Sequence, residues 1–315
     1  YYDYEISLNG TPVQYGSRNS DYSVRVEQDL AEGFIRDSTS PYFLYLAPAA
    51  PHGWPVPERR FADQPSSVPP WRPASFDEAD ISDKPSWLRG IPPMDAKEKA
   101  MIDRFRLDQL RTLNSLDAMV GSIVDTLEET GQIGNTMIIY TSDNGYLWGE
   151  HRLRGKNVPY EESIRVPLIV RYDPLTAQPS VDQHILANID LAPTILDLAN
   201  VTGATKMEGR SFLPLLSDPA STDWRHYLLI EHWAPQRSDR LPIYCAIRSD
   251  RYMYVDYFWG EDELYDLQND PLELENRISD PAKVGALGDL KDQEQLLCSP
   301  PPPSSLHVDD PSRFG

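Results

Sequence analysis

An aspartate and an asparagine follow directly after an apolar segment, in the sequence Tyr140-Thr-Ser-Asp-Asn-Gly-Tyr146. We expect Thr136 to Thr141 to form a buried strand, so that Asp143 and Asn144 lie beyond its carboxyl end, where open α/β sheets bind ligands. Carboxylate and amide oxygens suit hard cations such as Ca²⁺ and Mg²⁺. The alternative interpretation is a polar Asp-Asn-Gly turn that binds nothing.

A histidine and a lysine could act on an anionic substrate of such a site. His52 follows the aromatic-rich run Tyr42 to Ala47, which we predict to be a second buried strand. Its imidazole could transfer a proton or bind an oxyanion, or it could simply be exposed. Lys156 ends the basic run that begins at Arg152, which could neutralise a multiply charged anion or form an ordinary charged surface.

Together these groups suit the hydrolysis of an anionic ester. The cation would polarise the oxygens, the lysine would stabilise charge, and the histidine would protonate the leaving group. A nucleophile is not evident, because Ser142 lacks the Gly-x-Ser-x-Gly pattern of a nucleophile elbow.

Alternating helices and strands are expected to position these residues. Apolar spacing predicts helices over Tyr22 to Arg36 and Asp95 to Gly131, and Pro167 to Arg171 is predicted to be a third strand. A further helix is expected over Asp190 to Asn200, with Asp190 as its N-cap. This alternation favours an α/β sandwich with a largely parallel sheet. Residues 48–93 contain 11 of the 29 prolines and are expected to be irregular.

The pattern changes after residue 200. Short strands are predicted at Tyr227 to Glu231, Tyr244 to Arg248 and Tyr252 to Asp256, as in a smaller antiparallel sheet. We therefore expect an α/β domain over 1–216, a C-terminal α+β subdomain over 217–297, and a proline-rich tail over 298–315. Residues 260–295 hold 11 acidic and 3 basic side chains, which we interpret as a solvated face.

Composition narrows the class of protein. The 29 Lys and Arg residues against 49 Asp and Glu residues give a net charge of −20, which argues against nucleic acid as a partner. No apolar run of about 18 residues is present, so no membrane span is expected. Cys245 and Cys298 give neither a zinc signature nor a disulfide framework.

Several motifs together resemble the sulfatase family. The narrower likeness is to N-acetylglucosamine-6-sulfatases, through Tyr4-Glu-Ile-Ser-Leu-Asn-Gly10 and Asn188-Ile-Asp190. The segments that carry the resemblance are Thr141-Ser-Asp-Asn-Gly145, Gly149-Glu-His-Arg-Leu153, Gly155-Lys156, Pro159 to Arg171, Asn188 to Ala199, Met207 to Leu216 and Glu263 to Pro271.

The resemblance implies an alkaline-phosphatase-like α/β fold with a smaller C-terminal sheet domain. It implies hydrolysis of sulfate esters on amino-sugar units of glycans, with N-acetylglucosamine 6-sulfate as the expected unit, so the partner would be a sulfated glycan or a small sulfate ester. By position, Asp143 and Asn144 would be ligands of a divalent ion, usually Ca²⁺. Lys156 and His52 would bind the sulfate and assist the leaving oxygen.

The departures from the family pattern are as informative as the matches. The family's nucleophile is a formylglycine made from a Cys-x-Pro-Ser-Arg cysteine; this motif, the paired aspartates and a Lys-x-His pair lie upstream in the family and do not occur here. The resemblance therefore implies a fragment that binds Ca²⁺ weakly and hydrolyses no sulfate ester alone. A phosphodiester or phosphonate hydrolase of the same superfamily and a non-catalytic glycan-binding relic are the alternatives. The family's usual locations imply a secreted, periplasmic or lysosomal protein.

Overall fold

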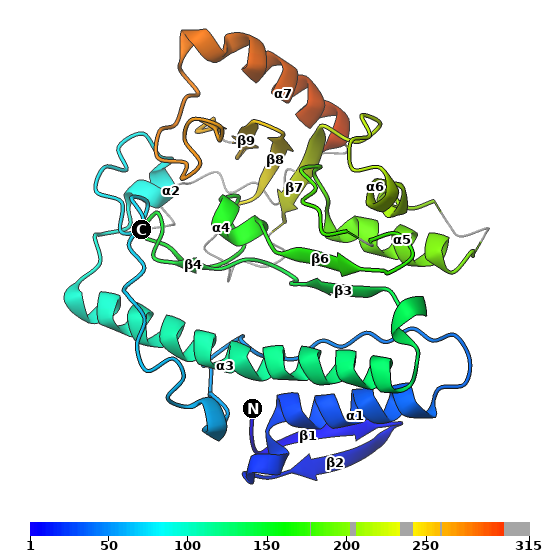
Figure 1. Ribbon diagram of the computed structural model, residues 1–315. Coiled ribbons are helices and arrows are strands. Elements are labelled where there is room, and N and C mark those ends of the chain that lie inside the picture. Colours follow the sequence, from blue (N-terminus) through cyan, green and yellow to red (C-terminus); the bar gives the residue numbers. More distant parts are fainter. Residues whose placement is uncertain (177, 202–205, 234–241, 259, 299–315) are drawn as a thin grey trace. The chain divides into compact units, whose positions relative to one another are not determined.

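The chain forms two compact units. The computed structural model describes residues 1–176, 178–201, 206–233, 242–258 and 260–298 (Figure 1). The first unit comprises Tyr1–Trp71, Asp95–Met137 and Tyr172–Pro174, and the second comprises Arg72–Met94, Ile138–Arg171 and Leu175–Gly315. The predicted boundary near residue 217 stays a prediction, and residues 299–315 of the predicted tail lie outside the described residues.

Two helices form the frame of the first unit. Helix α1 spans Ser23–Asp37 and α3 spans Ala96–Glu129, which confirms both helices predicted from apolar spacing. Asp95 caps α3, because its carboxylate accepts the Glu98 N–H at 2.8 Å while the Glu98 side chain accepts the Asp95 N–H. One cluster of buried residues at these helices consists of Tyr22, Val24, Ala50, Leu116 and Met119.

A β-hairpin precedes α1. Strands β1 (Tyr4–Leu8) and β2 (Thr11–Tyr15) pair antiparallel around Asn9-Gly10, whose φ angles are 50° and 85°. Positive φ at both positions is what the tightest hairpin turns require, and Asn-Gly adopts it readily. This hairpin was not predicted, although Asn9-Gly10 is a sequence signal for it. The unit also contains the 3₁₀ helices η1 (Asn19–Asp21), η2 (Arg59–Phe61) and η3 (Ile133–Asn135).

The predicted strand from Tyr42 to Ala47 is wrong. The segment pairs with none of the described strands, and Phe43 and Tyr45 are 65 % and 80 % exposed. A strand needs a neighbour that satisfies its backbone groups, and an apolar run without one is not a strand. The predicted irregular character of residues 48–93 is confirmed, since their only helices are η2 and the short α2 (Ser86–Arg89).

Four antiparallel strands organise the second unit. They lie in the order β10-β9-β8-β7. Their bounds are Tyr227–His232 for β7, Tyr244–Ser249 for β8, Tyr252–Asp256 for β9 and Glu263–Asp266 for β10. The three predicted short strands are thus confirmed, and β10 is added from the acidic segment.

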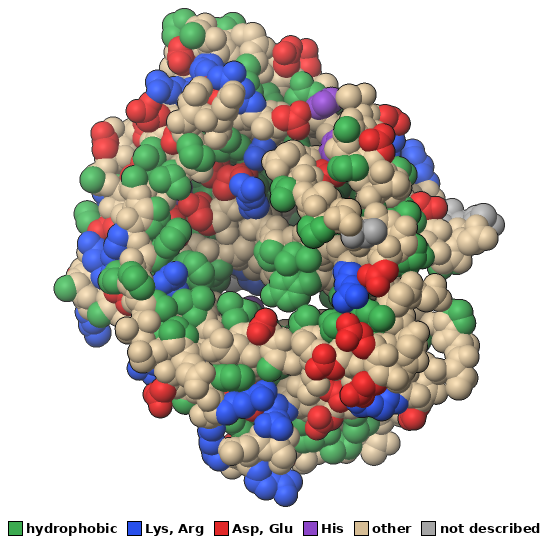
Figure 2. Space-filling view, viewed as in Figure 1, with side chains coloured by type: hydrophobic (Ala, Val, Ile, Leu, Met, Phe, Trp, Pro, Cys, Tyr) green, Lys and Arg blue, Asp and Glu red, His purple; other side chains and the backbone are tan. Residues whose placement is uncertain are grey.

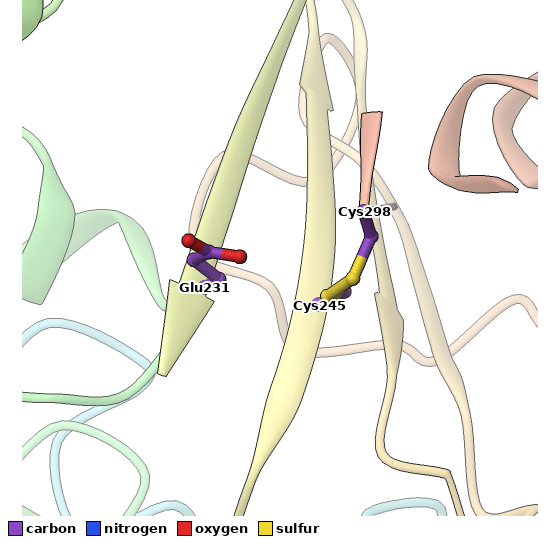
Figure 3. A group of neighbouring side chains, drawn as sticks. All are labelled: Glu231, Cys245 and Cys298. Carbon is purple, nitrogen blue, oxygen red and sulfur yellow. A yellow bond between two sulfur atoms is a disulfide. The ribbon is translucent and has the colours of Figure 1, made fainter. Parts of the chain in front are cut away.

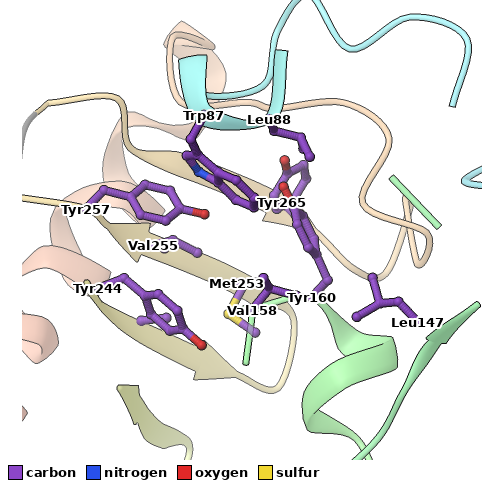
Figure 4. Close-up of a cluster of buried hydrophobic side chains, with 11 residues drawn as sticks. Trp87, Leu88, Leu147, Val158, Tyr160, Tyr244, Met253, Val255, Tyr257 and Tyr265 are labelled. Atoms are coloured by element: carbon purple, nitrogen blue, oxygen red, sulfur yellow. The ribbon is translucent and has the colours of Figure 1, made fainter. Parts of the chain in front are cut away.

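The acidic segment contributes to the core of this sheet, not only to its surface. Glu263 of β10 is fully buried, and its carboxylate accepts hydrogen bonds from the hydroxyls of Tyr160, Tyr257 and Tyr265. These rings and Trp87 of α2 belong to one buried cluster (Figure 4). The prediction that residues 260–295 form a solvated face is therefore wrong for this side chain, because Tyr160, which is 103 residues away in sequence, and the nearby Tyr257 and Tyr265 supply its donors.

A disulfide joins β8 to the end of helix α7 (Val284–Leu297). Cys245 and Cys298 are bonded, with their Cα atoms 6.3 Å apart (Figure 3). Glu231 lies near this bond, but the joined sulfurs are not free thiolates for a metal. The pairing was not predictable from the sequence, since a separation of 53 residues between two cysteines gives no signal. Helix α7 packs on β7, β8 and β9.

The predicted strands β3 (Ile138–Thr141) and β6 (Leu168–Arg171) are confirmed, but they are not buried as predicted, since Tyr140 and Ile169 are exposed, and their pairing is antiparallel. The expectation of a largely parallel sheet is wrong for the pairings among the described residues, all of which are antiparallel. Parallel neighbours need a long crossover, usually a helix. Between β3 and β6 lie only the hairpin β4 (Leu147–Trp148) with β5 (Arg154–Gly155) and the four-residue helix α4 (Glu161–Ile164).

The helix predicted after Asp190 is confirmed as α5 (Leu191–Leu198). Asp190 precedes it but does not cap it through its side chain. Its buried carboxylate instead accepts from the Arg225 guanidinium and, at 2.8 Å, from the Arg210 N–H. The remaining helices of the unit are α6 (Leu213–Ser217), η4 (Asn188–Asp190) and η5 (Pro281–Lys283).

Charge on the surface is mixed. On the face shown in Figure 2, Lys and Arg side chains lie interspersed with Asp and Glu. None of the described helices combines the length and the apolar character needed to cross a bilayer.

Candidate functional site

Asp143 and Asn144 follow the end of β3, as predicted. The Asp143 carboxylate is exposed, and its Oδ1 accepts the Asn144 N–H at 2.9 Å. The Asp143 carbonyl accepts from the Asn188 side-chain amide at 3.1 Å. Asn144 is half-buried, and its amide donates to the Gly145 carbonyl at 2.8 Å. These bonds fix the turn so that the amide oxygen of Asn144 remains available to another partner.

Lys156 is that partner. Its Nζ donates to Asn144 Oδ1 at 2.8 Å, across 12 residues of sequence, and the side chain is half-buried. Lys156 comes directly after β5, whose pairing with β4 returns the chain toward the end of β3. The structure therefore brings together three of the four predicted site residues: Asp143, Asn144 and Lys156.

Gly145 connects this turn to helix α4. Its N–H donates to the Ser163 carbonyl at 2.8 Å, and a Cβ on Gly145 would lie 2.0 Å from the Glu162 carbonyl oxygen. A larger residue would force the two backbones apart, so only glycine allows this close approach. The position of the Asp143-Asn144 turn therefore depends on α4. This contact was not predictable from the sequence.

His52 belongs to the first compact unit, whereas the other three predicted residues belong to the second. It is exposed, its N–H donates to the Ala49 carbonyl at 2.8 Å, and its own carbonyl accepts from the Tyr1 hydroxyl at 2.9 Å. Both bonds involve the backbone of His52 and not its imidazole. Its participation in a shared site stays a prediction.

The neighbouring Arg152 has a structural role instead of an anion-binding one. Its guanidinium donates to three backbone carbonyls, those of Glu78, Ala79 and Ile91, at 2.9–3.2 Å. Its donors thus hold a loop in place, so the predicted basic run does not act as one unit. Lys156 is the member of the run that reaches Asn144.

The donor set at the end of β3 fits a hard cation only in part. Asp143 and Asn144 offer carboxylate and amide oxygens, the types that Ca²⁺ prefers. Ca²⁺ takes about 6–8 oxygens, however, and Asn144 Oδ1 already accepts from Lys156. These two residues could therefore contribute to a Ca²⁺ site but could not complete one.

Two family models match the chain. The model described as "Sulfatase" matches residues 5–201, and the model described as "N-sulphoglucosamine sulphohydrolase, C-terminal" matches residues 149–297. The first covers more than half of the chain and includes His52, Asp143, Asn144 and Lys156.

Curated proteins that are similar to this chain are named as sulfatases. A fruit-fly (Drosophila melanogaster) protein named extracellular sulfatase SULF-1 homolog is 34 % identical over 244 residues, covering 73 % of this chain and 22 % of that protein. The goat (Capra hircus) N-acetylglucosamine-6-sulfatase is 34 % identical over 247 residues, covering 76 % of this chain and 43 % of that protein. The chain thus spans less than half the length of these relatives.

Solved structures share the fold. One is described as bound to its substrate D-glucosamine-2-N,6-O-disulfate; it has a TM-score of 0.83 and 22 % identity, covering 95 % of this chain and 73 % of that chain. A phosphonate monoester hydrolase from Silicibacter pomeroyi has a TM-score of 0.72 and 23 % identity, covering 98 % and 66 %. The predicted alkaline-phosphatase-like α/β fold is confirmed, and the chain belongs to the sulfatase family.

Proposed function

We propose that this chain is part of an enzyme that hydrolyses sulfate esters on amino-sugar units of glycans, with N-acetylglucosamine 6-sulfate as the expected unit. Membership of the sulfatase family supports this activity, as do the names of the relatives. The observation that carries the proposal is the contact of Lys156 Nζ with Asn144 Oδ1, beside the exposed Asp143 carboxylate. It places a cation next to two oxygen ligands, as an anionic substrate requires.

Each residue has a distinct role in this proposal. Asp143 and Asn144 hold part of a Ca²⁺ site, and a bound Ca²⁺ would supply positive charge for the sulfate oxygens. Lys156 contacts the sulfate and the leaving oxygen, because an ammonium group has three donors and Asn144 uses one of them. His52 binds the sulfate and protonates the leaving oxygen, which restores a neutral sugar hydroxyl.

We expect the 315-residue chain alone to bind Ca²⁺ weakly and to hydrolyse no sulfate ester. Two ligand residues leave most of the coordination shell of Ca²⁺ to water. Both cysteines are joined in a disulfide, so neither is a precursor for a formylglycine nucleophile. Turnover of a sulfate ester by the purified chain would contradict this expectation.

Nitrogen–proton NMR of the chain, with Ca²⁺ present, tests the site separately from turnover. N-acetylglucosamine 6-sulfate should shift the amide signals of Asp143 to Gly145 and of Lys156, whereas unsulfated N-acetylglucosamine should not. The Lys156→Ala variant should lose these shifts, and Lys97→Ala, which changes an exposed lysine of α3, should keep them.

Three other outcomes would contradict the proposal. Equal shifts with both sugars would favour a glycan-binding relic. Larger shifts with a phosphonate monoester would favour a phosphonate hydrolase. The absence of shifts with any of these compounds would show that Asp143, Asn144 and Lys156 do not form a binding site.

We also propose a secreted, periplasmic or lysosomal location. The Cys245–Cys298 disulfide supports it, because such bonds persist in oxidising compartments and are rare in the cytosol. Mass spectrometry of the protein from its native source, after alkylation without reduction, tests this location. Alkylated Cys245 and Cys298 would contradict it.

A further inference from the structure

Three side chains with metal-binding chemistry meet inside the second unit. His151 lies in the loop between β4 and β5, Glu162 lies in α4, and Glu273 follows β10. One ligand atom from each lies within 4.8 Å of the others. His151 and Glu273 are fully buried and Glu162 is half-buried. Segments that are far apart in sequence thus place an imidazole and two carboxylates around one point.

Each member of this group has one buried polar atom that is unsatisfied. His151 Nε2, Glu162 Oε2 and Glu273 Oε1 are buried and make no hydrogen bond within the part of the chain that the structure describes. A buried polar group without a partner lowers the stability of the fold, so native proteins rarely retain one. Three such atoms at one point indicate that a common partner binds all of them.

The other ring nitrogen of His151 identifies what Nε2 can accept. His151 Nδ1 lies 2.7 Å from Glu78 Oε2, and Lys84 Nζ lies 3.6 Å from the second oxygen of Glu78. Since a carboxylate accepts hydrogen bonds, we assign the ring proton to Nδ1, which leaves a lone pair on Nε2. Histidine ligands of metals almost always donate their other N–H in this way.

The ring is also fixed in orientation. It stacks on Tyr160 with centroids 4.2 Å apart and an interplanar angle of 22°. The backbone N–H of His151 donates to the Ser75 carbonyl at 2.7 Å, and φ is 50°, a value uncommon for a residue with a side chain. A histidine with an uncommon backbone conformation and a fixed ring orientation suits a ligand-binding site, where the position of the ligand atom must be fixed.

The two carboxylates have too few donors of their own. Glu273 Oε2 accepts the Glu161 N–H at 2.8 Å, whereas Oε1 has no donor among the described residues. Burial raises the pKa of Glu162 and raises that of Glu273 well above its usual range. The group therefore contains one imidazole lone pair and two carboxylate oxygens that accept no hydrogen bond from the described residues, and a cation or shared protons would satisfy them.

We propose that His151 Nε2, Glu162 and Glu273 bind one divalent transition-metal ion, with Zn²⁺ the best match. An imidazole with carboxylates suits Zn²⁺, whereas Ca²⁺ prefers oxygen alone. Zn²⁺ binds such atoms at about 2.0–2.2 Å, so its ligand atoms lie within about 4.4 Å of each other. Small side-chain rotations would close the present group onto an ion, and partly exposed Glu162 offers an entry path.

The ion would act as a structural brace. It would join the β4–β5 loop, α4 and the segment after β10, in addition to the bonds that Glu273 and Lys84 make there. The backbone of α4 is also the surface on which Gly145 rests. The site uses none of the residues proposed to hold Ca²⁺ or sulfate, so it is independent of the proposed function.

Zinc titration by calorimetry tests the proposal on the full chain after treatment with a chelator. We expect about one Zn²⁺ per chain. Loss of an outer partner of a metal ligand weakens affinity by about 10–100-fold, so Glu273→Gln, which removes a ligand, should weaken it by at least about 100-fold. The matched control Glu275→Gln, at an exposed neighbour, should bind as the wild type does.

A second pair of variants protects the test against misfolding. Glu162→Gln changes a partly exposed ligand and should also lose Zn²⁺, while His226→Gln, at an exposed histidine, should not. Circular dichroism in chelator confirms that each variant folds. Equal Zn²⁺ affinity in wild type and ligand variants would overturn the site. Absence of Zn²⁺ binding in the wild type would also overturn it, and would show that shared protons satisfy the group.

Discussion

Asp266 and Glu273 are both buried acids of one acidic segment, yet their surroundings differ in kind. The Asp266 carboxylate accepts from Arg251, Lys283 and Asn269 at 2.6–2.9 Å. These donors, led by Arg251, hold the pKa of Asp266 well below its usual range. Glu273 has one backbone donor, and burial raises its pKa well above its usual range. Burial alone thus does not say what a carboxylate does; the number of its donors does.

Glu263 shows a third solution between these two. It is as buried as Glu273, and burial raises its pKa, but three tyrosine hydroxyls donate to it. Every oxygen of Glu263 has a donor, so this carboxylate belongs to the packed core. Glu273 Oε1 has none within the described residues, so this carboxylate points to a missing ligand. The number of hydrogen-bond donors to a buried carboxylate thus distinguishes structural acids from candidate metal ligands.

The largest effect is expected from the disulfide, because the loop it closes contains both acids. Replacing Cys245 and Cys298 by serine should lower the free energy of unfolding by about 4 kcal/mol, as for the closure of a loop of this length. Urea denaturation measures it, and reduction of the wild type should reproduce it. A loss below about 1 kcal/mol would show that the packing of this segment does not need the bond.

Removal of Asp266 should come next. Asp266→Ala leaves Arg251 and Lys283 without their shared acceptor, and we expect a loss of about 2 kcal/mol, less than for a deeply buried pair because both cations reach solvent. Asp223→Ala, which breaks an exposed pair with Arg210, should cause no measurable change. Equal losses in the two variants would contradict the distinction between buried and exposed acids.

The lowered pKa of Asp266 fixes the sign of its pH dependence. The folded protein keeps this carboxylate charged where the unfolded chain is already protonated, so its contribution is present above the ordinary value of 3.8 and is lost as pH falls below it. Wild type should therefore lose more stability than Asp266→Ala between pH 5 and pH 2. Parallel curves from urea denaturation across that range would contradict the assignment.

Glu27 extends the comparison to the first unit. Its Oε2 is buried without a described partner, and burial raises the pKa to about 7 from 4.5. The folded state binds the extra proton in this window, so stability falls as pH rises from 4.5 to about 7. Glu27→Gln should remove about 1–2 kcal/mol of that fall, since partial exposure weakens the full effect.

Glu27 also separates a raised pKa from metal binding. It is not among the groups of described residues that could hold a metal, so Glu27→Gln should leave Zn²⁺ affinity unchanged in calorimetry. If Glu27→Gln leaves the pH dependence of stability unchanged, the raised pKa of Glu27 is contradicted. If Glu27→Gln weakens Zn²⁺ binding, Glu27 takes part in metal binding, and the distinction between a raised pKa and a metal site is contradicted.

The smallest effect on stability is expected at Glu273 itself. In chelator, Glu273→Gln should stabilise the chain by about 1 kcal/mol, because an amide needs neither a buried charge nor an extra proton at this position and brings donors to His151 and Glu162. Saturating Zn²⁺ should reverse the order, since only the wild type gains binding energy. Thermal unfolding with and without Zn²⁺ measures both. Destabilisation in chelator would show that the carboxylate is already satisfied.

Local pattern was sufficient for much of the fold. Apolar spacing predicted α1 and α3, and β-rich runs between turns predicted β7, β8 and β9. It failed at Tyr42 to Ala47, where the composition of a strand is present but a pairing partner is not. It also failed on the direction of β3 and β6, because pairing is a property of two segments.

The site was predictable to a similar degree. The turn Asp143-Asn144-Gly145 was predictable because it follows an apolar strand. Its contact with Lys156 was not, because that contact depends on the β4–β5 hairpin. The group around His151 was not predictable. Glu162 and Glu273 resemble ordinary surface acids in sequence, and only the fold brings them to a histidine whose tautomer Glu78 sets.

The most direct test of a metal-binding group at His151 is the nitrogen NMR spectrum of its imidazole. We predict that, in chelator, Nδ1 carries the proton and Nε2 is bare, because Glu78 accepts from Nδ1. Addition of one equivalent of Zn²⁺ should shift Nε2 strongly while the proton stays on Nδ1. A protonated Nε2 that Zn²⁺ does not change would contradict the proposal, since the carboxylates of Glu162 and Glu273 would then already have their donor.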